Sequence, residues 1–401
     1  MNITIVGGGF GGVKAALELA KDSTNVITLI SDKPDFQYYP ALYGTATGHS
    51  HAQSWVPLGQ IFAGKDNIRV VLDEIISIDP KKHVLMGVAG GVYAYETVIM
   101  ALGAVTTYFG IEGLDTYAYG IKSAAEIKKL KHHLYSQLSE EGEIDKHYVI
   151  VGAGPTGVEL AAALGSYLER LCRHYGVSHR SIKINLIEAA PRVLPKMSET
   201  TSAKVTARLK KLGVNVQTGQ AVQSATADNL VVNGKPVKSH TVIWTSGVAN
   251  HPFYKENEQH FSFAPNGRVV VDDYMLAATD VYVIGDNAAT PFTGLAQTAL
   301  HDAIFVADNF RRAKATQPPK QYKAVMPPVV VPVGENWAVF EWRKIRLSGW
   351  FASLIRRVAD LMGYSDILPI GLSLGVWRAQ RVLEDDYFTP SRRIDAAKDT
   401  I

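Results

Sequence analysis

Cysteine is almost absent from this chain of 401 residues, which has one, Cys172. A single cysteine excludes an intramolecular disulfide, a redox-active cysteine pair and a cysteine-only metal site, and with scattered histidines we expect no bound metal. No run of 18 uninterrupted apolar residues is present, which argues against a bilayer-spanning helix. The formal net charge of +3 does not indicate nucleic-acid binding, and we expect none. A predicted strand begins at residue 3 and leaves no room for a signal peptide. We therefore expect the protein to lie on the cytoplasmic side.

Glycine, by contrast, is arranged twice in the same pattern. Each copy follows a short apolar strand, 3–6 or 148–151, and precedes an alanine-rich helix. The glycines are Gly7, Gly9 and Gly12 in the first copy and Gly152, Gly154 and Gly157 in the second. In this pattern the first glycine allows a sharp turn, the second lets the backbone approach a pyrophosphate, and the third lets helix and strand pack closely. Two copies in strand–turn–helix context predict two bound dinucleotides and an α/β fold with two Rossmann-like units.

Acidic residues follow the second strand of each unit, where a Rossmann fold contacts the adenosine ribose. In the second unit this residue is Glu188, whose carboxylate would repel a 2′-phosphate and so predicts NADH over NADPH. Arg192 lies close by in the sequence and leaves NADPH open. In the first unit either Ser31 or Asp32 is placed to meet the ribose. A solvated strand end is the alternative for each acid.

A third apolar strand, 281–284, runs into Gly285 and Asp286. This aspartate is placed to hold a hydroxyl of a ribityl chain, and a plain loop acid is the alternative. We also expect helices at 124–142 and 201–212, strands at 182–187 and 242–245, and a proline-rich linker or edge at 316–332.

Taken together, these residues resemble the type II NADH:quinone oxidoreductases, a branch of the two-dinucleotide-binding-domain flavoproteins. The resemblance runs over nearly the whole chain. The segments that carry it are Gly7–Gly12, Tyr39–Gly48, Ala101–Gly103, Gly152–Leu160, Ile187–Pro195, Ile243–Val248, Ile284–Asp286 and Leu295–Ala299.

The resemblance implies a glutathione-reductase-like FAD/NAD(P) fold. Residues 1–112 and 253–330 would form a discontinuous FAD-binding domain, residues 113–252 an NADH-binding domain, and residues 331–401 a membrane-anchoring or dimerisation region. It also implies roles for single residues. The FAD contacts would be Gly7, Gly9, Phe10, Gly11, Gly12, Ser31, Asp32, Thr47, Ala101, Gly103, Gly285, Asp286, Ala296 and Gln297. The NADH contacts would be Gly152, Gly154, Pro155, Thr156, Gly157, Glu188 and Gly247.

Three residues would take part in catalysis: Glu159 in proton delivery beside the nicotinamide and flavin, Gln297 facing flavin and quinone, and His301. The sequence departs from the family at two places. The family often has an acid where Ser31 stands, and its second glutamine is His301 here. A histidine can supply a proton near neutral pH, and a plain polar contact is the alternative.

Near the C-terminus, residues 347–362 show apolar side chains at helical spacing. They are Leu347, Trp350, Phe351, Leu354, Ile355, Val358, Leu361 and Met362, and the other positions carry Arg343, Lys344, Arg346, Arg356 and Arg357 with no acid between 342 and 359. Such a cationic amphipathic helix suits an anionic membrane surface. Packing on the protein's own core and a homodimer contact are the alternatives. A second apolar stretch, 367–377, is too short to span a bilayer.

The expected function is hydride transfer from NADH to FAD, followed by two-electron reduction of a membrane quinone (menaquinone or ubiquinone) without proton pumping. The protein would sit peripherally on the cytoplasmic side of the cell membrane. Sulfide:quinone reductase and disulfide reductase chemistry need a cysteine pair, which the chain lacks. A ferredoxin-type reductase with a protein acceptor and an NADH-sensing flavoprotein stay open as alternatives.

Overall fold

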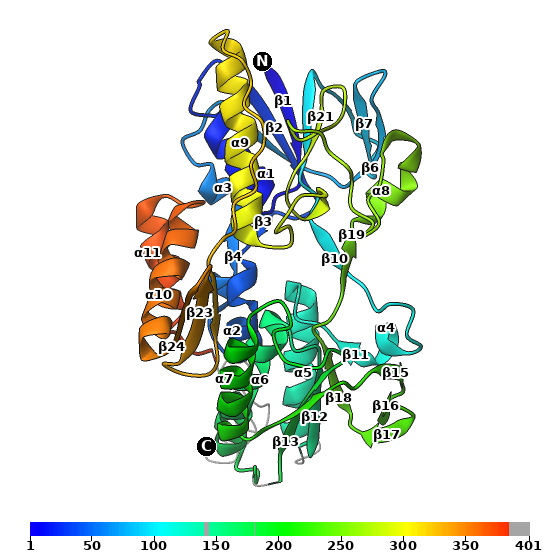
Figure 1. The fold of residues 1–401 in the computed structure, drawn as a ribbon, viewed down its shortest axis with the longest axis vertical. Helices are drawn as coiled ribbons and strands as arrows, with labels where there is room; N and C mark the ends of the chain where they lie inside the picture. Colours follow the sequence, from blue (N-terminus) through cyan, green and yellow to red (C-terminus); the bar gives the residue numbers. More distant parts are fainter. Residues whose placement is uncertain (140–143, 180, 385–401) are drawn as a thin grey trace, which may run out of the picture.

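Two mainly parallel sheets, each with a glycine-rich turn at one edge, form the two halves of the molecule (Figure 1); in the first, only the edge strand β20 runs antiparallel to its neighbour. The computed structural model describes residues 1–139, 144–179 and 181–384. The first sheet has six strands, in the order β20 (Leu276–Ala278), β21 (Val281–Val283), β9 (Thr97–Met100), β1 (Asn2–Val6), β2 (Val26–Ser31) and β5 (Ile68–Leu72). Its centre is a continuous rather than alternating apolar run, because β1 and β9 are buried on both faces.

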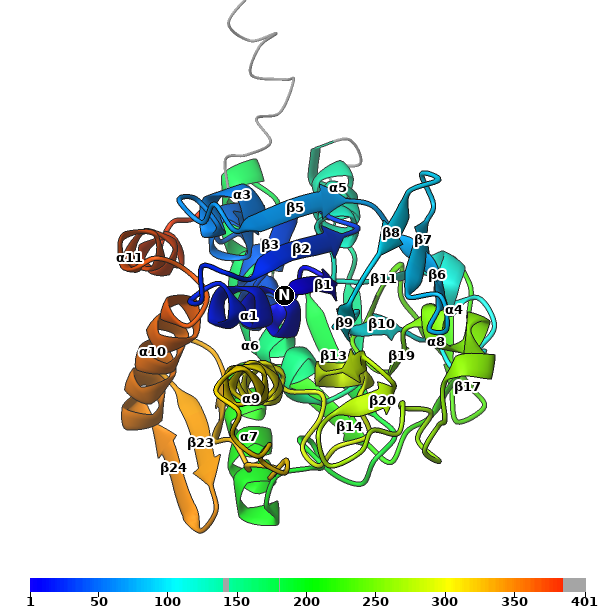
Figure 2. The same cartoon turned by 90° about the horizontal axis from the view of Figure 1, so that it is seen from above.

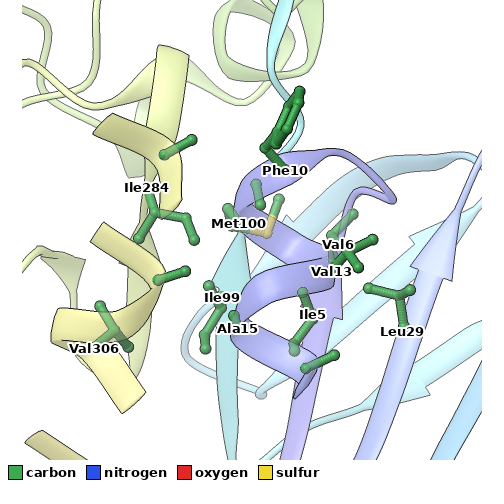
Figure 3. Close-up of a cluster of buried hydrophobic side chains, with 14 of the residues drawn as sticks. Ile5, Val6, Phe10, Val13, Ala15, Leu29, Ile99, Met100, Ile284 and Val306 are labelled. Carbon is green, nitrogen blue, oxygen red and sulfur yellow. The ribbon is translucent and has the colours of Figure 1, made fainter. Parts of the chain in front are cut away.

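Two helices pack together on this first sheet: α1 (Phe10–Leu19) and α9 (Ala296–Lys314). Figure 3 shows Val13 and Ala15 of α1 against the strands, with Val306 of α9 beside them, and all three side chains are buried. The smaller elements of this half are β3 (Asp35–Gln37), β4 (Trp55–Pro57), α3 (Leu58–Ile61), β6 (Ile75–Asp79), β7 (Val84–Gly87), β8 (Val92–Ala94) and α8 (Pro252–Glu256). Helix α9 follows β21 in the chain, so a late segment completes the first half.

The second sheet repeats the arrangement with five strands. Their order is β11 (Ala118–Tyr119), β18 (Thr241–Trp244), β12 (His147–Val151), β13 (Lys183–Glu188) and β14 (Val214–Thr218). The associated elements are α4 (Leu114–Tyr117), α5 (Ala124–Ser139), α6 (Pro155–Tyr175), α7 (Glu199–Lys211), β15 (Val222–Ala225), β16 (Asn229–Val232) and β17 (Lys235–Lys238). Helix α6 begins at a proline, which is favoured at a first helical position, and ends at the left-handed Gly176. The two units confirm the predicted α/β class.

The halves are joined by a short antiparallel ribbon of β10 (Ala104–Thr106) and β19 (Val248–Asn250). Trp244 stabilises the chain next to this ribbon, because its indole Nε1 donates a hydrogen bond to the carbonyl of Thr107 at 2.9 Å. One early helix, α2 (Leu42–Ala46), crosses over and packs with the core of the second half. The predicted domain boundaries at 112 and 252 fall close to this ribbon and stay a prediction.

The C-terminal elements are β22 (Val329–Pro332), β23 (Ala338–Trp342), β24 (Ile345–Gly349), α10 (Trp350–Ser365) and α11 (Ile370–Ala379). The prediction of one helix over 347–362 is wrong at its start. Residues 345–349 form a strand that pairs with β23, and the helix begins only after Gly349, whose φ is 96°. The end of the segment 316–332, which was predicted to be a linker or edge, is β22, an edge strand of the sheet β22-β23-β24. Residues 385–401 of the predicted C-terminal region lie outside the described residues.

This C-terminal region is packed against both halves and gathers along one side of the molecule (Figures 1 and 2). Val331, Val333 and Val339 join the core of the second half, whereas Tyr364 and Val376 join that of the first. The region is therefore part of the fold, beyond any role as an anchor. Over the ranges that the structure describes, we find no helix with the length and hydropathy to span a bilayer.

Candidate functional site

The first glycine turn has the geometry that a dinucleotide needs. Gly7 has a φ of 115°, and a Cβ there would overlap the carbonyl oxygen of Ala101. A Cβ on Gly12 would overlap the carbonyl oxygen of Gly7, whereas a Cβ on Gly9 would enter open space. Gly9 is also the N-cap of α1 and provides no side-chain cap. The first N–H groups of the helix are thus left for an anion that approaches past Gly9.

The second turn repeats this geometry residue by residue. Gly152 has a φ of 102° beside Ser246, and a Cβ on Gly157 would overlap the carbonyl oxygen of Gly152. Gly154 borders open space and is the N-cap of α6 without a side-chain cap. Pro155 and Thr156 form the first helical positions of α6. Both turns therefore fit a pyrophosphate, as the predicted cofactors require.

Three strand ends meet at the first turn, because β1, β9 and β21 are parallel neighbours. This brings Gly7, Ala101 and Gly285 to the same edge, with Asp286 next in the chain. Burial raises the pKa of Asp286, although Arg268 and the Gly294 N–H favour its carboxylate. A partly desolvated carboxylate at this edge is suited to accept hydrogen bonds from ligand hydroxyls.

Asp302, which the sequence analysis missed, supports this edge from α9. Its carboxylate accepts hydrogen bonds from the Gly285 N–H at 2.9 Å and from the Tyr322 hydroxyl at 2.6 Å. Asp302 thereby holds the backbone that carries Asp286.

The two candidates for the first ribose contact lie in different surroundings. Ser31 is buried against Gly8 of the turn, and its hydroxyl bonds the backbone of Lys33 at 2.8 and 3.2 Å. Asp32 is half exposed and forms a 3.2 Å ion pair with Lys33. Of the two, Ser31 is the residue at the turn.

The remaining predicted FAD contacts do not all lie at this turn, and Thr47, at the end of α2, reaches the second half, where its carbonyl accepts a hydrogen bond from Arg170 at 3.0 Å. The ring centroid of Phe10 lies 5.0 Å from that of Phe36. Thr47 is buried and its hydroxyl donates to the Tyr43 carbonyl at 2.9 Å. Gly11 packs against Ile284. Gly103 has a φ of 75°, and its carbonyl accepts a hydrogen bond from Asn287 at 2.7 Å. Ala296 and the exposed Gln297 open helix α9.

Glu188 ends β13 beside the second turn. Its carboxylate accepts the Ala153 N–H at 2.6 Å and the Ala190 N–H at 2.8 Å. Arg192 is tied down by the Met197 and Pro195 carbonyls and the Ser202 hydroxyl, at 2.5, 2.9 and 3.1 Å. Because these bonds hold its guanidinium, Arg192 is poorly placed to receive a 2′-phosphate. Gly247 lies at the crossing, where its carbonyl accepts a hydrogen bond from Lys122 at 3.1 Å.

Glu159 is buried in the second turn of α6 and contacts the C-terminal region. Its Oε1 lies 3.0 Å from Nη1 of Arg356 in α10. Burial raises the pKa of Glu159 to about 7, even though the Arg356 charge favours the carboxylate. A carboxyl that titrates near neutrality in a buried setting is suited to give and take protons.

The structure corrects the role expected for Arg356, which the sequence analysis placed on the outer, cationic face of the helix. Arg356 points inward and is only 9% exposed, with Asp360 and Glu159 as ion-pair partners. The absence of an acid between 342 and 359 misled the prediction, since Asp360 lies one turn along the helix and Glu159 is 197 residues away. The Arg356–Asp360 spacing of four on one helix face is the signal that could have revealed the pair.

His301 lies one turn after Gln297 on α9 and is half-buried. Its Nε2 is 3.0 Å from the Lys323 carbonyl oxygen, and its ring lies beside that of Tyr322. The hydrogen bonds of His301 and Glu159 thus lead to different elements, and a shared proton route stays a prediction.

Comparisons with known proteins cover almost the whole chain. A family model described as pyridine nucleotide-disulphide oxidoreductase matches residues 1–303. The type II NADH:quinone oxidoreductase of Staphylococcus saprophyticus is 25% identical over 394 residues, which cover 92% of this chain and 97% of that protein. The type II NADH:quinone oxidoreductase NdhA of Mycobacterium tuberculosis is 27% identical over 93% of this chain and 86% of its own.

Among solved structures, NDH2 from Plasmodium falciparum in complex with NADH superposes with a TM-score of 0.86 at 18% identity, covering 97% of this chain and 99% of its own. The likeness of the structures concerns the fold. Together with the sequence relatives it confirms the resemblance predicted from the motifs.

Proposed function

The chain belongs to the pyridine nucleotide-disulphide oxidoreductase family, and on that premise we propose that it transfers a hydride from NADH to FAD and two electrons from there to a quinone. The predicted oxidoreductase class, with FAD and NADH as cofactors, is confirmed. The pairing of two glycine turns with uncapped helix N-termini is the observation that supports the electron route most directly. One chain thereby holds both dinucleotides.

The residues of the chain bind and orient the cofactors, and the cofactors carry the chemistry. FAD, when bound, supplies an acceptor for the hydride and a donor for the quinone. Gly7–Gly12 and Asp286 would hold it in the first half, and Gly152–Gly157 with Glu188 would hold NADH in the second. Alignment of two reactants by such contacts contributes about 7–11 kcal/mol in favourable cases.

Two protons must accompany two electrons onto a quinone. Glu159 is our candidate proton donor, because a pKa of about 7 leaves it partly protonated at neutral pH. Gln297 at the start of α9 and His301 one turn later are candidates for contacts with the quinone. The relatives that cover 92% and 93% of this chain are named NADH:quinone oxidoreductases, which favours a quinone over a protein acceptor here.

The outer face of the C-terminal region supports peripheral binding to an anionic membrane surface. Trp350, Phe351 and Met362 are 60%, 69% and 64% exposed on α10. The same C-terminal region exposes six cations: Arg343, Lys344, Arg346, Arg357, Arg378 and Arg381. Apolar rings flanked by arginine and lysine match the boundary between acyl chains and anionic headgroups. We propose that the protein binds the cytoplasmic side of the cell membrane and does not pump protons. The alternative is that a second copy of the chain covers this face in a homodimer.

Anaerobic spectroscopy tests the electron route. One equivalent of NADH should bleach the flavin absorbance of the purified protein, and a short-chain menaquinone or ubiquinone should then restore it, the faster of the two marking the preferred acceptor. Bleaching without recovery would move the proposal to a protein acceptor or an NADH sensor. No bleaching would overturn it.

Flotation with vesicles tests the membrane face. Replacing Trp350, Phe351 and Met362 by serine should abolish binding to anionic vesicles without loss of FAD. Val92→Ser is the matched control, because Val92 is 68% exposed on β8, away from this face. A wild-type protein that dimerises through the face but does not float with vesicles would favour the homodimer.

A further inference from the structure

Helix α10 presents opposite chemistry on its two faces. Its outer face is the exposed apolar one, and its inner face buries Arg356, Asp360 and Tyr364. Arg356 makes five hydrogen bonds: Nε donates to Asp360 at 3.0 and 2.9 Å, Nη1 to Glu159 at 3.0 Å and Val330 at 3.4 Å, and Nη2 to Pro40 at 2.8 Å. One side chain thus joins α10 to α6, β22 and the 3₁₀ turn Tyr39–Ala41.

Such an arrangement is not explained by stability alone. A buried ion pair often contributes little net stability, because desolvation offsets the attraction between the charges. The planar guanidinium, in contrast, holds two carboxylates in defined places through its fixed fork of donors. Of these carboxylates, Asp360 lies on the same helix as Arg356, whereas Glu159 lies just past the second glycine turn.

Resting on the proposed function, we infer that Arg356 is a positioning residue that couples helix α10 to Glu159. Through it the seating of α10, the helix with the proposed membrane face, controls where the Glu159 carboxyl is held and how readily it is charged. Arg356 need not touch either cofactor for this role.

The charges around Glu159 determine whether each neighbour favours or opposes the charged form of its carboxyl. From α10 it faces Arg356 and Asp360, and from α2 it faces Tyr43. Tyr38 and Tyr364 stack 4.0 Å apart next to Asp360. Burial raises the pKa of all three tyrosines, so they are neutral near pH 7. Arg356 therefore favours a charged Glu159, and Asp360 opposes it.

Opposite shifts from two substitutions test the coupling. In the FAD-bound full chain, the pH titration of the Glu159 carboxyl is followed by its infrared C=O band, identified by its loss in Glu159→Gln. Arg356→Gln should move the midpoint up by about 1–3 pH units. Asp360→Asn should move it down, because Arg356 then acts on Glu159 alone. The pH profile of flavin reoxidation should shift in the same directions.

Arg357→Gln is the matched control, since Arg357 is the exposed neighbour on the same helix, and it should leave the midpoint unchanged. Arg356→Lys should shift the midpoint of the Glu159 titration less than Arg356→Gln does. If Arg356→Gln does not fold, Arg356→Lys and Asp360→Asn together provide the test. Unchanged midpoints, or shifts of the same sign in Arg356→Gln and Asp360→Asn, would overturn the coupling. The infrared titration needs no quinone, so a failure of quinone reduction would be seen separately.

Discussion

The two glycine turns share a backbone but differ in the side chain at the fifth position of the following helix. In α1 this residue is Lys14, and in α6 it is Glu159. Both side chains reach α10. The Lys14 ammonium donates to the Asp366 carbonyl at the end of that helix, at 3.1 Å, and Glu159 meets Arg356 in its middle, at 3.0 Å.

This difference shows how one turn can serve two purposes. A cation is favoured at the C-terminal carbonyls of a helix, so Lys14 fastens α10 to the first half. Glu159 is instead a buried acid whose pKa is raised to about 7. Of the two copies of the turn, only the second is followed by an acid at the fifth helical position.

The acid after the second strand differs as well. Glu188 accepts two backbone N–H groups, one of them from Ala153 in its own glycine turn. Ser31 in the first unit bonds only the backbone of Lys33 among the contacts described for its side chain. The residue in contact with the turn is thus a carboxylate in the second unit and a hydroxyl in the first.

The largest effect should come from the third glycine of each turn. Gly157→Ala forces a Cβ into the Gly152 carbonyl, and we expect a loss of about 4 kcal/mol or more in the free energy of unfolding, with NADH affinity reduced over about 100-fold. Gly12→Ala should do the same to FAD retention. Flavin content, urea unfolding and NADH titration measure these losses.

Gly154→Ala is the control for this pair, because its Cβ would enter open space. It should keep the stability of the wild type and weaken only NADH binding. If Gly154→Ala leaves NADH affinity unchanged, the second turn does not hold the pyrophosphate.

A smaller effect is expected from Glu159 through pH. In the unfolded chain a glutamate loses its proton near pH 4.5, and in the folded protein Glu159 loses it near 7. The folded state therefore binds more protons between these values, and its stability falls as the pH rises through them. Glu159→Gln should remove about 3 kcal/mol of this fall, because the pKa is raised from 4.5 to about 7. Urea unfolding at pH 4.5 and pH 8 measures the fall in the free energy of unfolding. An equal fall in the variant and the wild type would contradict the raised pKa of Glu159.

Glu188→Gln should weaken the distinction between the two nucleotides. The preference for NADH over NADPH should drop by roughly tenfold, equal to about 1.4 kcal/mol, since the repulsive charge is lost while the shape is kept. The ratio of kcat/KM for the two nucleotides is the readout. Asp32→Asn, at an exposed acid of the first unit, should leave this ratio as it is.

The smallest effect concerns Lys14. Lys14→Gln should lower the free energy of unfolding by about 1 kcal/mol. The variant loses the 3.3 Å ion pair between Lys14 and Glu18 and the hydrogen bond from Lys14 to the end of α10. Lys21 pairs with the same Glu18 but is 62% exposed and does not reach α10. Lys21→Gln should therefore cost less than about 0.5 kcal/mol, and equal losses would show that the α10 contact contributes nothing.

The sequence by itself determined the features that depend on neighbours in the chain. The two turns, the strands before them and the helices after them follow from glycine spacing and apolar runs, and the structure has each of them. The apolar stripe of α10 was also readable, because a helix repeats every 3.6 residues, whereas its exposure came from the tertiary structure.

Only the tertiary structure decided which residues meet across long separations. It turned 345–349 into a strand, because β23 offers an edge on which to pair. It also directed Arg356 inward, to a glutamate 197 residues away. Periodicity reports which side of a helix is apolar, and it carries no information on what the polar side will contact. A buried charge needs a partner, and that partner is supplied by the fold.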